Sequence, residues 1–307
     1  MIDGSSRVEG ADSPLEGTAE RLWFLSLEIT GRCQLHCRHC YADSGPWGDH
    51  GTMTTPDWRR LLEEAAAMEV RMVQLIGGEP TLHPDLPDLV RHALDLGLKV
   101  EVYSNLARSI PERLWEVLAL PGVALATSYH AADPETHDRV TGRRGSHRWT
   151  RANIVEALRR GIPLRVGVVA VSQDQDLQAA IADLEALGVA GIGVDRLREV
   201  GRGARDCAPD LDQLCGHCGE GRLAISPNGE AWPCVFARWL VLGNVRTTSL
   251  ADLHRRARPV RERLQREFHS LARSTRCPPS DGNPCGGPLC IPHLRPRHRS
   301  PRLGAEG

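Results

Sequence analysis

The chain has 307 residues, enough for two average domains or for one larger α/β barrel with an appendage. It carries 38 Lys and Arg residues against 39 Asp and Glu residues, so strong electrostatic attraction to nucleic acid or to an anionic membrane is not expected. Hydrophobic residues make up 41% of the chain, which is ordinary for a globular protein with a sizeable core. The unusual feature is the presence of ten cysteines.

The N-terminal segment and the cysteine content together indicate where in the cell the protein works. Residues 1–20 are polar and acidic, lack an apolar signal-peptide core and are expected to form a flexible leader. No window approaches the roughly 18 apolar residues of a membrane span. Because a cytosolic chain of this size does not need disulfides, clustered cysteines are interpreted as metal ligands or catalytic thiols. We therefore expect a cytoplasmic, metal-dependent protein.

From Leu22 onward, short apolar runs alternate with amphipathic stretches. The pattern predicts strands at Leu22–Ile29, Met72–Ile76, Lys99–Tyr103, Val123–Thr127, Leu164–Val171 and Gly191–Val194. It predicts helices at Pro56–Glu69, Leu86–Leu96, Pro111–Leu118, Thr150–Arg160 and Leu177–Leu187. Such alternation indicates parallel strands in a partial barrel or a doubly wound sheet, with ligands at the carboxyl ends of the strands.

The pattern changes after about Gly201. A β-hairpin is predicted from Leu223–Ser226 and Glu230–Phe236, and a helix runs from Ser249 towards Ala272 with an interruption at Pro259. Residues 291–307 are basic and proline-rich and are expected to be disordered. The chain is thus divided into a leader (1–20), an α/β core (21–200), a cysteine-rich extension (201–290) and a tail (291–307).

Three cysteines follow the first predicted strand at close spacing. Cys33, Cys37 and Cys40 are separated by three and then two residues, so a tight loop brings three thiolates to one inorganic cluster. An ordinary [4Fe–4S] cluster takes four protein ligands, so three ligands leave one iron open for a substrate or cofactor. Zinc bound by these thiolates and by His36 or His39 is the alternative, although zinc motifs usually pair cysteines two residues apart.

This arrangement resembles the radical SAM superfamily, whose hallmark is the same cysteine spacing after the first barrel strand. His39 precedes the third cysteine and Tyr41 follows it, as in many relatives, and Gly77-Gly78-Glu79-Pro80 at the end of the second strand matches the family's GGEP motif. The resemblance covers about residues 21–200. It implies a partial (β/α)6 barrel of the TIM-like, radical SAM type with a small cysteine-rich C-terminal extension.

The resemblance also implies cofactors and contacts. Cys33, Cys37 and Cys40 would hold a [4Fe–4S] cluster, and S-adenosylmethionine would bind its open iron and be cleaved to a 5′-deoxyadenosyl radical that abstracts a substrate hydrogen. The contacts implied for S-adenosylmethionine are His39, Tyr41, Gly77, Gly78, Glu79, Pro80, Ser104, Asn105 and Ser128, with an arginine for the carboxylate from among Arg139, Arg143, Arg144 and Arg196. Reduction of the cluster implies a flavodoxin or ferredoxin.

The later cysteines resemble a SPASM/twitch extension, in which a cysteine, a spacer and Gly-x4-Cys precede further cysteines. The implied ligands of at least one auxiliary [4Fe–4S] cluster are Cys215, Cys218, Cys234, Cys277, Cys285 and Cys290. The pattern departs from a full extension, because Ser280 stands near one expected cysteine and none follows Cys290, so two auxiliary clusters are not assumed. A zinc ribbon on Cys215 and Cys218 is the alternative. Cys207 fits no signature and is either an incidental thiol or a hydrogen-atom donor.

The resemblance implies a substrate class. Enzymes with this extension commonly modify ribosomally made peptides, so maturation of such a peptide is the first expectation, and a separate leader-peptide recognition protein would then act with this chain. Epimerisation, oxidation or decarboxylation of a sugar-containing small molecule is the alternative. A non-catalytic metal-binding module is disfavoured by the intact Gly77–Pro80 motif.

Overall fold

The computed structural model describes residues 21–172, 174–204 and 208–274, whose strands form one nine-stranded sheet in the order β6-β5-β4-β3-β2-β1-β7-β8-β9. The expected leader, 1–20, and the expected tail, 291–307, lie outside the described residues. The same holds for four of the ten cysteines: Cys207, Cys277, Cys285 and Cys290.

The six predicted core strands are confirmed. They are β1 (Phe24–Thr30), β2 (Met72–Gly77), β3 (Lys99–Tyr103), β4 (Val123–Tyr129), β5 (Leu164–Ala170) and β6 (Gly191–Arg196). All neighbours among them pair in parallel, and their spatial order follows the chain. A doubly wound sheet would reverse its order part-way, so the fold is the partial barrel of the two expected architectures.

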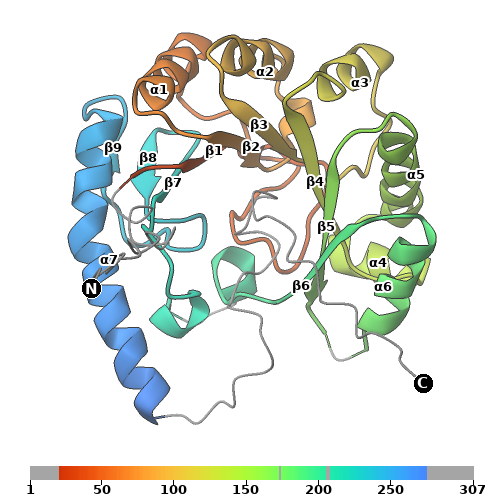
Figure 1. The fold of residues 1–307 in the computed structure, drawn as a ribbon. Coiled ribbons are helices and arrows are strands. Elements are labelled where there is room, and N and C mark those ends of the chain that lie inside the picture. The colour runs from red at the N-terminus through yellow and green to blue at the C-terminus, as the bar shows by residue number, and fades with distance from the viewer. Residues whose placement is uncertain (1–20, 173, 205–207, 275–307) are drawn as a thin grey trace, which may run out of the picture.

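Helices cover the outer face of this curved sheet (Figure 1). The predicted ones are observed as α1 (Thr55–Ala67), α2 (Leu86–Asp95), α3 (Glu112–Leu118), α5 (Ser146–Arg159) and α6 (Leu177–Ala186). One further helix, α4 (Pro134–Thr141), was not predicted. It is capped by the Asp133 carboxylate, which accepts the Thr136 N–H at 2.7 Å, and it ends at Gly142 in the left-handed conformation.

A polar layer crosses the barrel interior below the carboxyl ends of the strands. Ser26 donates to Gln74 at 3.1 Å, Gln74 donates to Glu101 at 2.7 Å, and Arg165 donates twice to Glu101 at 2.8 and 2.7 Å. The first three residues are in register on β1, β2 and β3, so they lie at one level of the barrel. Both oxygens of the buried Glu101 carboxylate are hydrogen-bonded, which offsets the cost of burying its charge.

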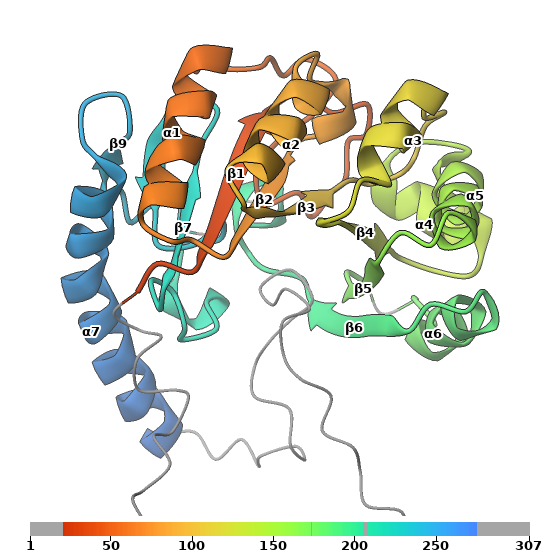
Figure 2. The same ribbon diagram turned by 45° about the horizontal axis from the view of Figure 1, so that its top comes forward.

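The C-terminal region extends the same sheet beyond β1. β7 (Arg222–Ile225) pairs in parallel with β1, and β8 (Glu230–Trp232) and β9 (Gly243–Asn244) follow as antiparallel strands. The predicted hairpin is confirmed, although its second strand ends four residues earlier than the expected Phe236. Because β7 lies directly beside β1, the first strand of the cysteine-rich extension lies next to the strand that leads into the cysteine triplet (Figure 2).

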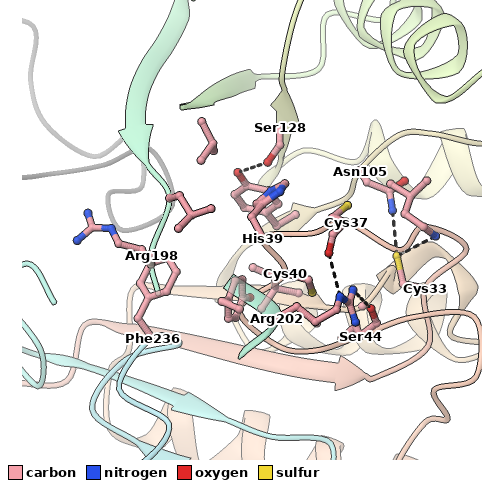
Figure 3. A pocket seen from close by; sticks show the side chains of 18 of the residues that line it. Cys33, Cys37, His39, Cys40, Ser44, Asn105, Ser128, Arg198, Arg202 and Phe236 are labelled. Carbon is pink, nitrogen blue, oxygen red and sulfur yellow. Dashed lines mark hydrogen bonds between the residues drawn. The ribbon is translucent and has the colours of Figure 1, made fainter. Parts of the chain in front are cut away.

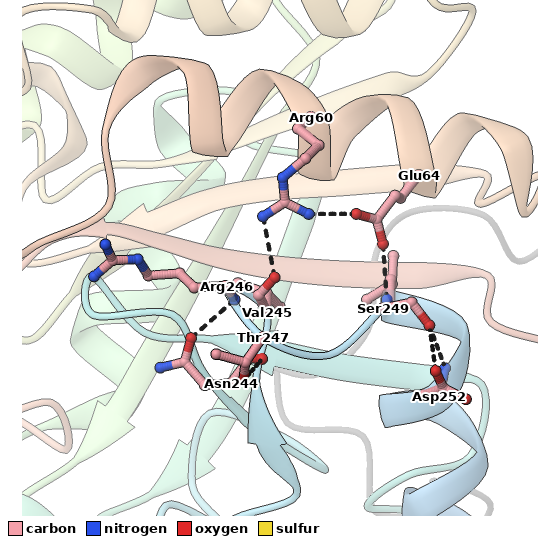
Figure 4. Close-up of polar contacts among 9 residues, drawn as sticks. Arg60, Glu64, Asn244, Val245, Arg246, Thr247, Ser249 and Asp252 are labelled. Carbon is pink, nitrogen blue, oxygen red and sulfur yellow. Dashed lines mark hydrogen bonds and ion pairs between the residues drawn. The ribbon is translucent and has the colours of Figure 1, made fainter.

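The last helix, α7 (Leu250–Ser274), corrects one prediction. It continues through Pro259, whereas the sequence pattern led us to expect an interruption there. Its first turn is fixed by Ser249, whose hydroxyl accepts the Asp252 N–H at 3.2 Å. Figure 4 shows how this turn is joined to α1. Glu64 of α1 accepts the Leu250 N–H at 2.8 Å, and Arg60 of α1 donates to the Val245 carbonyl at 3.0 Å.

Three short 3-10 helices complete the described structure: Pro80–Leu82, Gly201–Ala204 and Leu211–Gln213. Within the described part of the chain, no helix has both the length and the apolar character needed to cross a membrane.

Candidate active site

The cysteine loop after β1 is held by the backbone of the Gly77–Pro80 motif. The Gly78 N–H donates to the Thr30 carbonyl at 2.7 Å, and the Glu79 N–H donates to the Arg32 carbonyl at 2.8 Å. A Cβ on Gly77 would lie 2.3 Å from the Thr30 oxygen, and one on Gly78 would lie 2.2 Å from the Arg32 oxygen. Only glycine allows this approach, so the motif positions the start of the loop through its backbone.

The three cysteines line a cavity of about 840 Å³, counting the part that is open to solvent. Figure 3 shows Cys33 and Cys37 across the cavity from Arg198 and Phe236. Of the predicted contacts, those that line the cavity are Cys33, Cys37, Cys40, His39, Tyr41, Gly77, Gly78, Asn105, Ser128 and Arg196. The structure therefore brings together residues from the ends of β2, β3, β4 and β6 around the cysteine loop.

The thiols lie in a poorly solvated setting. The Cys33 sulfur accepts hydrogen bonds from the Leu35 N–H and from Asn105 Nδ2, both at 3.4 Å. Burial, together with the nearby Glu79 carboxylate, raises the pKa of Cys33 to about 12, and burial also raises the pKa values of Cys37 and Cys40. Because a metal ligand must be a thiolate, loading this site releases protons.

Glu79, Ser104 and Pro80 do not line the cavity, although they lie directly behind it. The Glu79 carboxylate is fully buried and accepts from the Ser104 hydroxyl at 2.7 Å, the Asn105 N–H at 2.8 Å and the Thr81 N–H at 3.0 Å. Burial raises its pKa despite these donors. The carboxylate thereby ties the end of β2 to the end of β3, and Pro80 begins the short helix that follows.

The cavity wall includes buried polar atoms with no hydrogen-bond partner among the described residues. His39 Nδ1 and the Tyr41 hydroxyl are such atoms. Burial, aided by the Arg202 charge, lowers the pKa of His39 to about 4, so its imidazole is neutral. Ser128 lies within 3.1 Å of the Tyr103 hydroxyl. Unpaired buried polar atoms in a cavity are costly, so their presence fits a site built for a polar ligand.

The sequence did not identify Arg202, which binds the cysteine loop most extensively. Its guanidinium donates to the Cys37 carbonyl at 2.9 Å and the Ser44 carbonyl at 2.5 Å (Figure 3). It also pairs with Asp43 at 2.8 Å. Its own N–H donates to the Cys40 carbonyl at 3.0 Å. Arg198 and Phe236 are further cavity residues that the sequence did not identify, and the Arg198 guanidinium lies 5.6 Å from the Phe236 ring.

The four arginines proposed to bind the carboxylate of S-adenosylmethionine lie in different places in the structure. Arg196 lines the cavity at the end of β6. Arg139 pairs with Asp174, Arg143 donates to the Gln34 carbonyl at 3.3 Å, and Arg144 is exposed. Arg139, Arg143 and Arg144 are not among the residues that line the cavity.

A second, smaller cavity lies beside β7 and contains three of the later cysteines. Cys215, Cys218 and Cys234 line it together with His217, and the sulfurs of Cys218 and Cys234 are 3.0 Å apart. Hydrogen bonds that the protonated Cys218 thiol donates to the neighbouring cysteine sulfurs, together with burial, raise the pKa of Cys218. The remaining proposed ligands lie outside the described residues. Three converging thiols fit an iron–sulfur cluster, and no described group of three or more His, Cys, Asp or Glu residues is arranged to hold a single metal ion.

Comparison with known protein families identifies both parts of the chain. Residues 27–184 match the model of the radical SAM superfamily. This chain belongs to the radical SAM superfamily. Residues 215–278 match SPASM, an iron–sulfur cluster-binding domain. The enzyme therefore uses a [4Fe–4S] cluster and S-adenosylmethionine, and its SPASM domain implies auxiliary iron–sulfur binding.

Curated relatives of this radical SAM enzyme include the PqqA peptide cyclase of Xanthomonas campestris pv. campestris (strain 8004), which is 30% identical over 273 residues covering 74% of this chain and 72% of the relative. The PqqA peptide cyclase of Bradyrhizobium diazoefficiens is 35% identical over 132 residues, covering 41% of this chain and 35% of the relative. Among solved structures, Streptococcus suis SuiB bound to S-adenosylmethionine has a TM-score of 0.64 at 18% identity, over 76% of this chain and 65% of SuiB. That likeness shows the shared fold.

Proposed function

We propose that this radical SAM enzyme matures a ribosomally synthesised peptide by a crosslink or another modification of a C–H bond. The observation that carries the proposal is the similarity to a PqqA peptide cyclase over nearly three quarters of both chains. SuiB, with the same fold, has been solved with its precursor peptide SuiA. The cavity also suits an extended substrate, because it is bounded by Arg196, Leu197 and Arg198 at the end of β6. β6 is an edge strand of the described sheet, and an extended peptide can pair with such an edge.

In this proposal, Cys33, Cys37 and Cys40 hold the catalytic cluster, and Arg196 with Ser128 and Asn105 binds the polar groups of S-adenosylmethionine. When bound, these cofactors supply a radical that removes one hydrogen atom from the substrate. The chain itself orients the ligands. Arg202 fixes the carbonyls of the cysteine loop, and the apolar walls formed by Tyr103 and Phe236 limit the access of water to the reacting centre.

We assign the regions of the chain on the same basis. Residues 21–200 form the catalytic core and residues 201–290 form the auxiliary cluster domain, with Cys215, Cys218 and Cys234 as ligands and the rest supplied from Cys277, Cys285 and Cys290. A separate protein recognises the leader peptide, and a flavodoxin or ferredoxin reduces the catalytic cluster. The enzyme works in the cytoplasm, where thiols stay reduced for cluster assembly.

The test uses enzyme reconstituted without oxygen and the peptide encoded beside its gene. Dithionite and S-adenosylmethionine should yield 5′-deoxyadenosine, and mass spectrometry should show a peptide that has lost hydrogen atoms at one residue pair. The Cys37→Ala variant is the control that lacks the catalytic cluster. If 5′-deoxyadenosine forms but only a sugar-containing small molecule is altered, the peptide proposal fails while the radical SAM assignment stands.

Iron analysis tests the second site separately. One catalytic and one auxiliary [4Fe–4S] cluster require about eight irons per chain. About four irons with one zinc would instead indicate a zinc ribbon on Cys215 and Cys218.

A further inference from the structure

Residues of the cysteine loop alternate between the cavity and solvent. Leu35, Cys37 and His39 line the cavity. The intervening residues, His36 and Arg38, are exposed. Because neighbouring side chains point to opposite sides, the outer surface of this loop lies one residue away from the cluster ligand Cys37. An electron entering from solvent has a short path here, and tunnelling rates fall steeply with distance.

The outer surface around this loop is positively charged. The Arg38 N–H donates to the Val140 carbonyl and Arg143 donates to the Gln34 carbonyl, so the loop lies against the end of α4. Four arginines in this region are exposed: Arg32, Arg38, Arg143 and Arg144. None of the four forms an ion pair with a carboxylate of the described chain.

The acidic groups nearby offset little of this charge. Asp43 is paired with Arg202, and the Asp138 carboxylate accepts from the Gly145 and His147 N–H groups at the start of α5. Asp49 is exposed and accepts the Gly51 N–H at 2.9 Å. Four arginines without an ion-pair partner in the described chain thus face solvent. The unpaired carboxylate beside them is that of Asp49, which is hydrogen-bonded within its own loop.

An exposed aromatic residue lies on the same surface. Trp47 is 87% exposed, and its ring lies 6.1 Å from that of His36 in an edge-to-face arrangement. An indole left in solvent beside a charged patch is typical of protein-binding surfaces. Its flat apolar face suits the exposed apolar edge of a flavin.

We propose that Arg32, Arg38, Arg143, Arg144 and Trp47 form the docking surface for an acidic flavodoxin that reduces the catalytic cluster. In this step one electron passes from reduced flavodoxin to the oxidised cluster, and no atom is transferred. The positive patch attracts the acidic partner and orients it over the cysteine loop. The inference rests on the radical SAM reaction and not on the identity of the substrate.

The test compares two reductants in the reconstituted holoenzyme, with 5′-deoxyadenosine formation as the readout. In the Arg38→Glu/Arg144→Glu variant we expect the apparent KM for reduced flavodoxin to rise about tenfold or more at low ionic strength. Dithionite is small and needs no docking, so the rate that it supports should be unchanged. Added salt should raise the wild-type KM towards that of the variant, since screening removes the attraction.

Two further variants sharpen the result. Arg91→Glu/Arg113→Glu reverses two exposed arginines on α2 and α3, and it should leave the KM for flavodoxin unchanged. Trp47→Ala should raise that KM without altering the rate with dithionite.

Several outcomes would overturn the assignment. They are an equal loss with dithionite, an unchanged KM for flavodoxin, or the same effect in the control variant. A raised KM for the peptide when dithionite supplies the electrons would assign the patch to the substrate instead. Complete absence of 5′-deoxyadenosine in wild type with dithionite would contradict the radical SAM reaction itself, which separates the two failures.

Discussion

At the scale of single residues, the geometry of the site depends on close backbone contacts more than on side-chain chemistry. Gly77 and Gly78 touch the carbonyls of Thr30 and Arg32, and Gly201, with φ of +59°, would place a Cβ 2.3 Å from the Tyr41 carbonyl. The cysteine loop is therefore clamped between the end of β2 and the segment that carries Arg202. A methyl group at either of these contacts would change the positions of the three thiols relative to one another.

Gly78→Ala tests the first clamp. A Cβ 2.2 Å from the Arg32 oxygen forces the loop away and breaks the hydrogen bond from Glu79, at a cost of more than about 2 kcal/mol in the free energy of unfolding. We expect the variant to lose most of its catalytic-cluster iron on reconstitution, measured by iron analysis and by visible absorption. Gly97→Ala is the matched control, because its φ is +78° but nothing lies within 4 Å of the added Cβ. It should cost about 1–2 kcal/mol of stability and retain full iron.

Asn105→Ala tests how the protein tunes the catalytic cluster. Asn105 Nδ2 donates to the Cys33 sulfur at 3.4 Å, and hydrogen bonds to ligand sulfurs stabilise the reduced, more negative state. Removing the donor should make the reduction potential of this cluster more negative, measured by redox titration with electron paramagnetic resonance. Ser128→Ala, at another cavity position without a bond to a cysteine, should leave the potential unchanged. An unaltered potential in Asn105→Ala would contradict this role.

At the scale of elements, the strands were predictable because each is a short, mostly apolar run bounded by turn residues, even where a polar residue such as Glu101 interrupts it. β3 was predicted at its observed bounds, Lys99–Tyr103, and β4 was extended only by Ser128 and Tyr129. Helix α4 was missed because Pro134–Thr141 is short and mostly polar, with one aliphatic residue, Val140, and therefore no apolar period. Its stability comes from its cap and from its packing beside α5.

The site was predictable only where its residues form local motifs. The cysteine triplet and the Gly77–Pro80 motif are recognisable from their spacing; the three cysteines, Gly77 and Gly78 line the cavity, whereas Glu79 and Pro80 lie behind it. Arg202 binds the Cys37 carbonyl across 165 residues of sequence, and Phe236 comes from the region after β8. Nothing in their local sequence marks these residues, because their roles arise from the sheet order that places β7 next to β1.

Pro259→Ala tests whether α7 is one continuous helix. Proline is about 3 kcal/mol less favourable than alanine inside a helix, and about 0.4–1 kcal/mol of this is offset by its more restricted unfolded chain, so a net gain of about 2 kcal/mol is expected. Pro259 is exposed, so the substitution loses no core contact. Urea unfolding followed by circular dichroism measures the gain, with Arg258→Ala as the control. A neutral or destabilising result would mean that the helix is interrupted at this position.

At the scale of the whole molecule, the core and the cysteine-rich extension share one sheet and one buried ion pair. Arg238 donates to both oxygens of Glu28 on β1, at 2.6 and 2.8 Å, and its guanidinium lies 4.1 Å from the ring centroid of Trp232. Glu28 is fully buried. Its carboxylate has Arg238 as a partner because the extension is folded onto β1. The two regions are expected to unfold together, since separating them would expose the edge of β1 and leave this carboxylate unpaired.

In the Arg238→Met variant, the pH dependence of the free energy of unfolding should reveal this coupling. Burial raises the pKa of Glu28 and the charge of Arg238 lowers it, so removing the arginine moves the folded-state pKa further above the unfolded value. Between these two pKa values the folded state binds more protons than the unfolded state, and stability then falls as pH rises, by up to about 1.4 kcal/mol per pH unit. Urea unfolding of the metal-free protein should show a modest deficit near about pH 5, from the lost contact with Trp232, and a deficit that grows towards about pH 8. The Glu28→Gln/Arg238→Met variant carries no titrating group at this position, so its deficit should not grow as pH rises. A deficit of equal size at every pH in Arg238→Met would show that Glu28 is not buried against the extension.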